Sequence, residues 1–429
     1  MKKLLAICII LMFFGIALMP AINSKTNNFG NQIRLFNDKS EESIVNIQAS
    51  SPYEYGLKVG RRFRLMYKII DFLADFVKKI QVSKSDIKNQ INDMEKNCPF
   101  FLDQLKGLSD SLNIKLERLI YLQNLFLSIF NHECTVTLAT GKATKNNQTF
   151  LTFNVDTRIG IGETISTILH RMFSLKCWIV RINTIRYKYA FWGIPVIYEF
   201  AFLNEKGLGW GSPGTRLTEN QSRYIDEGPG ISTMMLERLA IMTCKDVSEA
   251  AKLYKSIERA SQKGQGWFHQ YDSSSSCFCD KNGGILIIEH THNYIKTIFG
   301  NSTDITGERS DILWHANHHQ WLDPNLTGSV YPKEYPSSGL RAERAFELLN
   351  SSYGNITLET CMSITRDHGG GYDKNGKDSG DICRHPDKEN NSVTAYSWII
   401  QPKDLTVYWT YRSPCKSIFW KHDFSKRFG

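Results

Sequence analysis

The sequence of 429 residues lacks the features that mark several protein classes. It has no internal repeat, no long linker rich in Pro, Gly or Ser after the first fifty residues, and no motif typical of nucleic-acid binding. Apolar residues make up 41% and aromatic residues 12%, which excludes a disordered or low-complexity chain. The length allows two or three domains or one large unit of helices and sheets.

Blocks of one charge are also lacking. The formal net charge is +9, but the basic residues alternate with acidic and apolar ones instead of forming a run. This pattern predicts a solvated basic surface that favours anionic membrane surfaces, and no binding of nucleic acid.

Metal and cofactor motifs are missing as well. His315, His318 and His319 lie close together in the sequence, yet no H-E-x-x-H motif or paired C-x-x-C motif accompanies them. The glycines at 369–371 follow no predicted strand, which indicates a flexible loop and not a phosphate-binding turn. We therefore expect no metal site and no cofactor.

The N-terminus has the pattern of a secretory signal peptide. Two lysines precede an apolar run at residues 4–19, and small residues follow up to residue 24. The run is shorter than the roughly 20 residues that a membrane-spanning helix needs, although a retained N-terminal anchor is the alternative. Residues 1–24 are thus predicted to be a signal peptide, and the protein to be secreted or lysosomal.

Sequons and cysteines agree with export. Ten cysteines suit an oxidising compartment, and eight remain for disulfides when Cys8 leaves with the signal peptide and Cys134 stays free. Cys277 and Cys279 lack the spacing of a redox motif and favour disulfides. Predicted N-glycosylation sites stand at Asn147, Asn220, Asn301, Asn325, Asn350, Asn355 and Asn390.

The order of periodicities predicts an α+β fold. Apolar residues recur every three or four positions through 63–80, and helical patterns continue at 101–112 and 116–130. After Cys134 the sequence becomes strand-like, with a hairpin over 135–155 that turns at 141–148. Later strands are predicted at 177–185, 198–203, 208–211, 284–289, 294–299, 393–400 and 405–411, with helices at 231–255 and 341–350. Sheets covered by helices are the expected arrangement.

Cys134 is the main candidate for chemistry because it begins the first strand of this hairpin. The second strand ends in Asn154 and Asp156, two residues apart and so on one face. Since that end lies opposite the start of the first strand, we expect a thiol, an amide and a carboxylate to converge. The alternatives are an inert buried cysteine and an Asn–Asp pair that closes the strand end by turn hydrogen bonds.

Short motifs along nearly the whole mature chain resemble one known family. They are Tyr-Glu-Tyr-Gly-Leu-Lys-Val-Gly at 53–60, Leu-Lys-Gly-Leu-Ser-Asp at 105–110, Cys-Thr at 134–135, Asn-Val-Asp at 154–156, Asn-Glu-Lys-Gly-Leu at 204–208, His-Ala-Asn-His-His at 315–319, the arginines 341 and 344, Ile-Cys-Arg-His-Pro at 382–386 and Pro-Cys at 414–415. In this order and spacing they resemble the isopenicillin N acyltransferase family, the cysteine N-terminal-nucleophile hydrolases also called acyl-CoA:6-aminopenicillanate acyltransferases or peptidase C45.

The resemblance implies an αββα four-layer fold and self-cleavage between Glu133 and Cys134. A small helical chain, 25–133, would stay associated with a catalytic large chain, 134–429. The α-amino group released on Cys134 would be the base for its own thiol. Asp156 would orient the amine and thiol, Asn154 would complete the Asn-x-Asp pair, and Asn317 would donate to the oxyanion.

Two positions depart from the family pattern. Glu133 stands where the family usually has Gly. Phe153 stands where related bile-salt, N-acylethanolamine and ceramide amidases carry Arg, so an apolar substrate contact is expected there. Arg341 and Arg344 lie at i,i+3 on a predicted helix, where either surface salt bridges or binding of a substrate carboxylate, assigned here to Arg344, can be expected.

The sequence therefore predicts an amide hydrolase or acyltransferase that cleaves a small N-acyl amide, or takes an acyl thioester, through a thioester at Cys134. A lipid acyl hydrolase of the acid-ceramidase or phospholipase-B-like type is the second prediction. An inactive glycoprotein that kept the fold is the third.

Overall fold

The computed structural model describes residues 36–37, 44–75, 83–129, 133–158, 177–220, 222–261, 274–300, 310–376, 379–386 and 392–429. The predicted signal peptide and the sequons at Asn301 and Asn390 lie outside these ranges. Within them, no helix combines the length and the apolar character needed to cross a bilayer.

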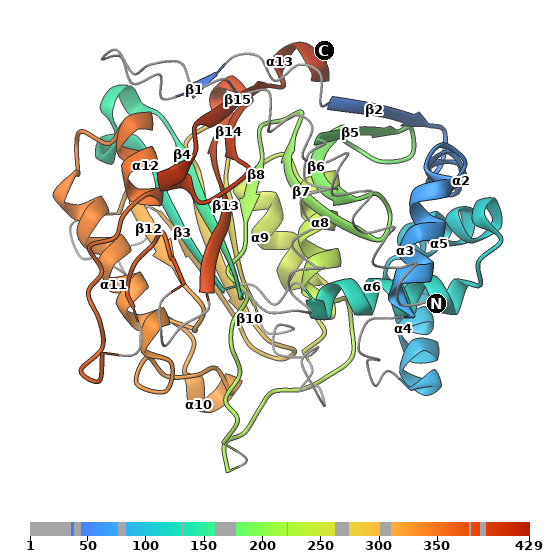
Figure 1. The fold of residues 1–429 in the computed structure, drawn as a ribbon, viewed down its shortest axis with the longest axis horizontal. Helices are drawn as coiled ribbons and strands as arrows, with labels where there is room; N and C mark the ends of the chain where they lie inside the picture. Colours follow the sequence, from blue (N-terminus) through green and yellow to red (C-terminus); the bar gives the residue numbers. More distant parts are fainter. Residues whose placement is uncertain are drawn as a thin grey trace, which may run out of the picture.

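Two β-sheets form the centre of the molecule (Figure 1). The seven-stranded sheet runs, from edge to edge, β1 (Phe36–Asn37), β15 (Phe419–Asp423), β14 (Thr406–Thr410), β13 (Ser392–Gln401), β4 (Phe150–Arg158), β3 (Glu133–Ala139) and β12 (Ile312–His315). The eight-stranded sheet runs β11 (Ile295–Phe299), β10 (Ile285–His290), β9 (Ser274–Cys279), β8 (Gly209–Gly211), β7 (Tyr198–Asn204), β6 (Tyr189–Ile194), β5 (Cys177–Ile182) and β2 (Ile44–Ala49).

Large aromatic side chains fill the space between the two sheets. Trp192 of β6 packs against Trp409 of β14 with ring centroids 3.7 Å apart and the rings tilted, and Phe153 of β4 lies edge-on to Trp210 of β8. Trp192 and Trp409 are almost completely buried. Each such ring removes a large apolar area from water, so this contact is the main hydrophobic core.

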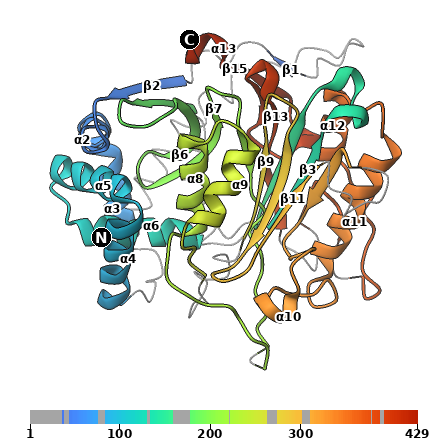
Figure 2. The ribbon, with the colours of Figure 1, turned by 180° about the vertical axis from the view of Figure 1, so that it is seen from behind.

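Helices cover the outer faces of both sheets. α11 (Pro336–Ser351) packs on β12 and β3, and α12 (Leu358–Thr365) packs on β4 and β13. On the other side, α8 (Thr233–Thr243) lies on β7 and α9 (Val247–Ser256) contacts β10. Both helices lie in front when the molecule is seen from behind (Figure 2). The layers follow the order helix, sheet, sheet, helix, which confirms the predicted αββα fold.

The N-terminal helices gather at one end of the eight-stranded sheet (Figure 1). They are α2 (Pro52–Arg62), α3 (Arg64–Ala74), α4 (Lys84–Asn97), α5 (Pro99–Leu112) and α6 (Leu116–Ile129). α2 and α5 cross at Gly56 and Gly107, where an added Cβ would lie 2.0 Å from a backbone oxygen of the other helix. Glycine is required at this crossing because the two backbones touch.

The same N-terminal segment supplies an edge strand to each sheet. β2 pairs in parallel with β5, and β1 pairs in parallel with β15. The segment is thus part of both sheets, a feature that the helical patterns of the sequence did not predict.

The predicted hairpin and most predicted strands are confirmed, whereas the helix predicted over 231–255 is two helices. α8 ends at Thr243, and the side chain of Asp246 caps the start of α9. The remaining helical elements are short: α10 (Pro324–Thr327), α13 (Ser425–Phe428) and 3-10 turns at Gly141–Ala143, Lys145–Asn147, Pro402–Asp404 and Pro414–Lys416.

The disulfide prediction is not met. All nine cysteines in the described ranges are free thiols, and eight of them are buried. Most belong to different strands and helices of the core, where each acts as a small apolar side chain. The even number of cysteines therefore does not predict disulfides here, because burial alone also explains why these positions carry cysteine.

Candidate active site

The register of the β3–β4 hairpin decides which way Cys134 points. Cys134 lies opposite Val155, while Thr135 lies opposite Asn154 and Glu133 opposite Asp156. Directly paired residues share a face and neighbouring residues alternate. The thiol therefore faces the other sheet, whereas Asn154 and Asp156 face the outer helices. Asn154 and Asp156 share a face as predicted, and the thiol lies on the opposite face of the hairpin.

The backbone of Cys134 is held by two buried side chains. Its N–H donates to Oδ1 of Asn317 at 2.9 Å, and its carbonyl oxygen accepts from the Arg341 guanidinium. Arg341 also donates to Oγ1 of Thr135 at 2.9 Å and to Oδ1 of Asn317 at 2.8 Å. Arg341 is fully buried, so these bonds are shielded from water and fix both peptide groups of Cys134.

A buried carboxylate positions the loop that carries Asn317. Glu289 of β10 accepts from the backbone N–H groups of residues 320, 321 and 322, and from Nε2 of His315 at 2.7 Å. Burial alone would raise the pKa of Glu289, but the bond from His315 and the nearby His319 lower it to about 2. The carboxylate therefore stays charged and anchors the loop.

The three histidines of this loop do not converge. His318 contacts Oγ of Ser338 through Nδ1 at 2.7 Å, and His319 contacts Oγ1 of Thr327 at 3.0 Å. Burial, and then the neighbouring His315, lower the pKa of His318 to about 3. These rings hold the loop on α11 and α10 and do not form a cluster.

The thiol of Cys134 lies in an apolar environment with two acidic groups nearby. Val136, Phe153 and Val155 share its face of the sheet. Burial raises the pKa of the Cys134 thiol, and the charges of Asp156 and Glu237 raise it further against the lowering effect of Arg341. Burial also raises the pKa of Glu237 to about 7, while bonds from serine hydroxyls, among them Oγ of Ser276 at 2.8 Å, oppose the rise.

Asp156 and Asn154 belong to a buried polar network on the outer face. Burial raises the pKa of Asp156 to about 6, although Arg341 and a 2.6 Å bond from Oγ1 of Thr394 lower it. Nδ2 of Asn154 donates to the carbonyls of Thr365 and Ile382, and its Oδ1 accepts from Ser397. Asn154 thus ties three segments of the chain together and does not touch the thiol.

Glu133, the residue before the nucleophile, is held as well. Its carboxylate is buried and pairs with Arg384, which is also buried. A buried pair of this kind keeps its geometry because either charge alone would be costly there. The peptide bond between Glu133 and Cys134 is therefore fixed on both sides.

Of the two residues predicted to contact substrate, Arg344 is engaged away from Cys134 and Phe153 lies on the face of the thiol. Arg344 donates to both carboxylate oxygens of Asp367 at 2.9 and 2.7 Å and also pairs with Glu347. Phe153 stacks edge-on against Trp398 with centroids 4.5 Å apart. Of the paired arginines, it is Arg341 that reaches Cys134, and Phe153 belongs to the core between the sheets.

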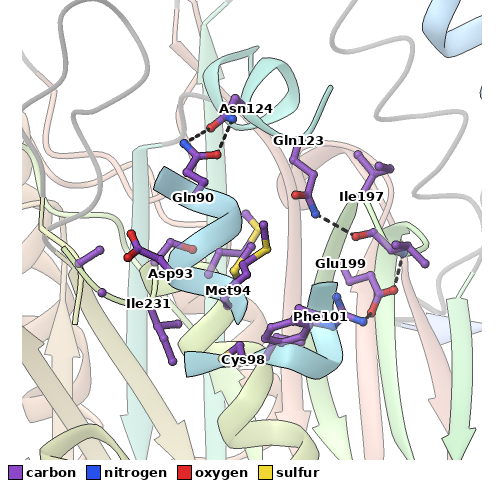
Figure 3. Close-up of a pocket in the computed structure, with 17 residues that line it drawn as sticks. Gln90, Asp93, Met94, Cys98, Phe101, Gln123, Asn124, Ile197, Glu199 and Ile231 are labelled. Carbon is purple, nitrogen blue, oxygen red and sulfur yellow. Dashed lines mark hydrogen bonds and ion pairs between the residues drawn. The ribbon is translucent and has the colours of Figure 1, made fainter. Parts of the chain in front are cut away.

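A cavity of about 120 Å³ lies between the N-terminal helices and the body (Figure 3). Met94, Phe101 and Ile231 contribute apolar surface, and Glu199 lies at one side. Glu199 accepts from the hydroxyl of Tyr55 at 2.7 Å and pairs with Arg238 at 2.6 Å. Cys134, Asn317 and Arg341 do not line this cavity, so it is separate from the candidate catalytic residues.

Sequence reasoning missed the roles of Arg341, Glu237 and Glu289. Buried residues of α11 recur at Ser338, Arg341 or Ala342, Ala345 and Leu349, and this spacing places Arg341 on the core side. This spacing in the sequence distinguishes Arg341, on the buried side of the helix, from Arg344, on its partly exposed side. Glu237 and Glu289 reach the site only through tertiary structure.

Three comparisons with known proteins bear on this site. A search of curated proteins finds no match. Among solved structures, penicillin V acylase from Agrobacterium tumefaciens is similar at 15% identity and a TM-score of 0.38, over 68% of this chain and 87% of that one. A mutant of conjugated bile acid hydrolase from Clostridium perfringens is similar at 12% identity and a TM-score of 0.42, over 68% of this chain and 93% of that one.

The family model for acyl-coenzyme A:6-aminopenicillanic acid acyl-transferase matches residues 164–414. This span is more than half of the 429 residues. The chain therefore belongs to the acyl-coenzyme A:6-aminopenicillanic acid acyl-transferase family, and it is an N-terminal-nucleophile cysteine hydrolase or acyltransferase that acts on amides.

Proposed function

We propose that the protein matures by cutting its own chain between Glu133 and Cys134, and then cleaves an N-acyl amide through a thioester on Cys134. The observation that carries the proposal is the clamp on the Cys134 backbone. Asn317 accepts from its N–H and Arg341 donates to its carbonyl, at the first residues of a central strand. An ordinary strand residue does not need two buried polar side chains for its own peptide groups.

In the maturation step the Cys134 sulfur attacks the carbonyl carbon of Glu133. The bond from that carbon to the Cys134 nitrogen breaks, the nitrogen takes the thiol proton, and a thioester links Glu133 to the sulfur. Water then hydrolyses the thioester, which leaves a carboxylate on Glu133 and a free amine and thiol on Cys134. The ion pair with Arg384 holds the Glu133 residue in place during this sequence.

In turnover the new α-amino group takes the proton of its own thiol, which suits an amine with an ordinary pKa near ~8. The thiolate attacks the substrate amide. Nδ2 of Asn317 donates one hydrogen to the Gly214 carbonyl at 2.8 Å, and its other hydrogen is the donor to the oxyanion. The amine half leaves with a proton, and the acyl group stays on sulfur. Water then gives a free acid, or an acceptor amine gives a new amide.

Burial of the thiol supports the order of the two steps. Cys134 is 2% exposed in the uncut chain, so no substrate reaches it there. The residues on its face, Val136, Phe153 and Val155, are apolar. An aliphatic or aromatic acyl group is the part of the substrate that suits this face.

We further propose that the protein is exported to the cell exterior or the lysosome and glycosylated. The apolar run at residues 4–19 supports export. Of the sequons in the described ranges, Asn147, Asn220, Asn325 and Asn355 are exposed and Asn350 is half-buried. Endoglycosidase treatment of natively expressed protein should lower its mass, and an unglycosylated protein retained in the cytosol would contradict this proposal.

The central test uses Cys134→Ala, Cys134→Ser and, as a matched control for loss of one buried thiol, Cys244→Ala. Intact mass spectrometry should show two chains in the wild type and in Cys244→Ala, and one uncut chain in Cys134→Ala. Cys134→Ser should cut slowly, because a hydroxyl can attack the same carbonyl. Only cleaved protein that has a thiol at residue 134 should release acid from a panel of N-acyl amides. An uncut but active wild type, or an active Cys134→Ala, overturns the proposal.

A further inference from the structure

Four side chains with metal-binding atoms meet on the outer side of the seven-stranded sheet. They are His368, Cys383, His385 and Cys415, and their nitrogen and sulfur atoms all lie within 4.8 Å of one another. Nε2 of His385 is 3.0 Å from Sγ of Cys415, and the rings of His368 and His385 stack with centroids 5.0 Å apart. None of the four has a part in the proposed chemistry at Cys134.

Two thiolates and two imidazoles are a typical ligand set for tetrahedral zinc. With bonds of about 2.0–2.3 Å, the ligand atoms of such a site stand about 3.3–3.8 Å apart. The observed separations reach this range with side-chain movements of about 1 Å. Two thiolates also balance the charge of one Zn²⁺, so no carboxylate is needed.

The ligands come from three segments that other contacts already hold in place. Cys383 N–H donates to the Asp367 carbonyl, which joins the segment of Cys383 and His385 to that of His368. Arg366 donates to the carbonyls of Pro414 and Ser417, on both sides of Cys415. His368 is exposed while Cys383 is buried, so the group has an open side through which an ion could enter.

From this cluster we propose that the protein binds one structural zinc ion through His368, Cys383, His385 and Cys415. The ion displaces the two thiol protons and joins the loop after α12, the 379–386 segment and the Pro414–Lys416 turn. Four protein ligands leave no position for water or substrate, so the site stabilises structure and does not take part in catalysis. The sequence-based expectation of no metal was based on motifs of regular spacing, and these ligands do not have one.

The position of Arg384 links the proposed zinc site to the surroundings of Cys134. Arg384 stands between two ligands, and its side chain pairs with Glu133. Its N–H donates to Oγ1 of Thr394 at 2.8 Å, and the same hydroxyl donates to Asp156. A fixed Arg384 thus positions both Glu133 and Asp156. This consequence for self-cleavage rests on the function proposed above, whereas metal binding does not.

The test is elemental analysis of the full-length protein, purified with zinc in the buffers and freed of excess metal by gel filtration. We expect one zinc per chain in the wild type and in the controls Cys244→Ala and His292→Ala. Cys383→Ser/Cys415→Ser should lose at least nine-tenths of the metal. Zinc retained by the folded double variant, or a folded wild type without zinc, overturns the proposal.

A second measurement on the wild type covers the case in which the double variant does not fold. Protein in which Co²⁺ replaces zinc should show the visible absorption of a tetrahedral site and a thiolate-to-cobalt band in the near ultraviolet. A spectrum without the thiolate band overturns the proposal. So does mass spectrometry that finds Cys383 and Cys415 joined as a disulfide.

Discussion

The two faces of the β3–β4 hairpin have opposite chemistry. The inner face carries the Cys134 thiol among Val136, Phe153 and Val155, and the outer face carries Glu133, Thr135, Asn154 and Asp156. Every charged group that fixes the backbone of Cys134 acts from the outer face. The thiol therefore points away from the polar side chains of the outer face, whereas Asn317 serves both the backbone of Cys134 and the proposed oxyanion.

The largest effect should come from removing the outer clamp. Arg341→Met keeps the length of the side chain but leaves Cys134 O, Thr135 Oγ1 and Asn317 Oδ1 without their buried donor. We expect a loss of about 4 kcal/mol in the free energy of unfolding, measured by urea denaturation. Arg344→Met, the control on the same helix, should cost less than ~1 kcal/mol because its ion pairs are partly exposed. Equal losses in the two variants would contradict the role given to Arg341.

Glu237, an acidic residue near the thiol, should make the free energy of unfolding depend on pH. The pKa of Glu237 is raised by burial from 4.5 to about 7, so the folded protein holds a proton that the unfolded chain releases in this window. The contribution of Glu237 to the free energy of unfolding is fully present below the pKa of this residue in the unfolded chain. It decreases by roughly 3 kcal/mol as the pH rises to about 7.

Glu237→Gln imitates the protonated form and should remove this slope. Relative to wild type, the variant should gain roughly 3 kcal/mol in the free energy of unfolding between about pH 4 and pH 8. Parallel pH profiles for the two proteins would show that Glu237 is not buried as described.

Variants at Asn317 test whether this side chain only holds the backbone of Cys134 or also donates to the oxyanion. Asn317→Asp keeps oxygen acceptors for Cys134 N–H and Arg341 but removes the Nδ2 donor. We expect the chain to be cut, and kcat to fall about 10²-fold, or ~2.7 kcal/mol, with little change in KM. Asn317→Ala removes the acceptors too and should reduce stability as well. An unchanged kcat in folded Asn317→Asp would exclude the oxyanion role.

The smallest effect is expected on the inner face. Phe153→Leu keeps an apolar side chain but loses the edge-on contact with Trp398. A cost of about 1 kcal/mol in unfolding free energy should follow, with normal self-cleavage. Failure to cut in a stable Phe153→Leu protein would show that the inner face helps to position the backbone after all.

The sequence predicted the hairpin and Cys134 at its start, because β-branched residues follow a helical stretch without a break. It did not predict which face the thiol occupies. Register depends on the turn at 141–148, which contains two short 3-10 turns, and a slip of one residue exchanges the faces. Glu289 and the ligands around Arg384 come from distant segments, so only the fold brings them to the site.

The edge strand β2 has a consequence for the fate of the cut protein. After cleavage, residues 44–49 would still be hydrogen-bonded to β5, and the Tyr55 hydroxyl would still reach Glu199 across the boundary. Loss of the small chain would uncover the backbone of β5 and leave an unpaired edge open to other chains. The two chains would thus form an obligate heterodimer, and its dissociation would lead to aggregation before any loss of the catalytic groups themselves.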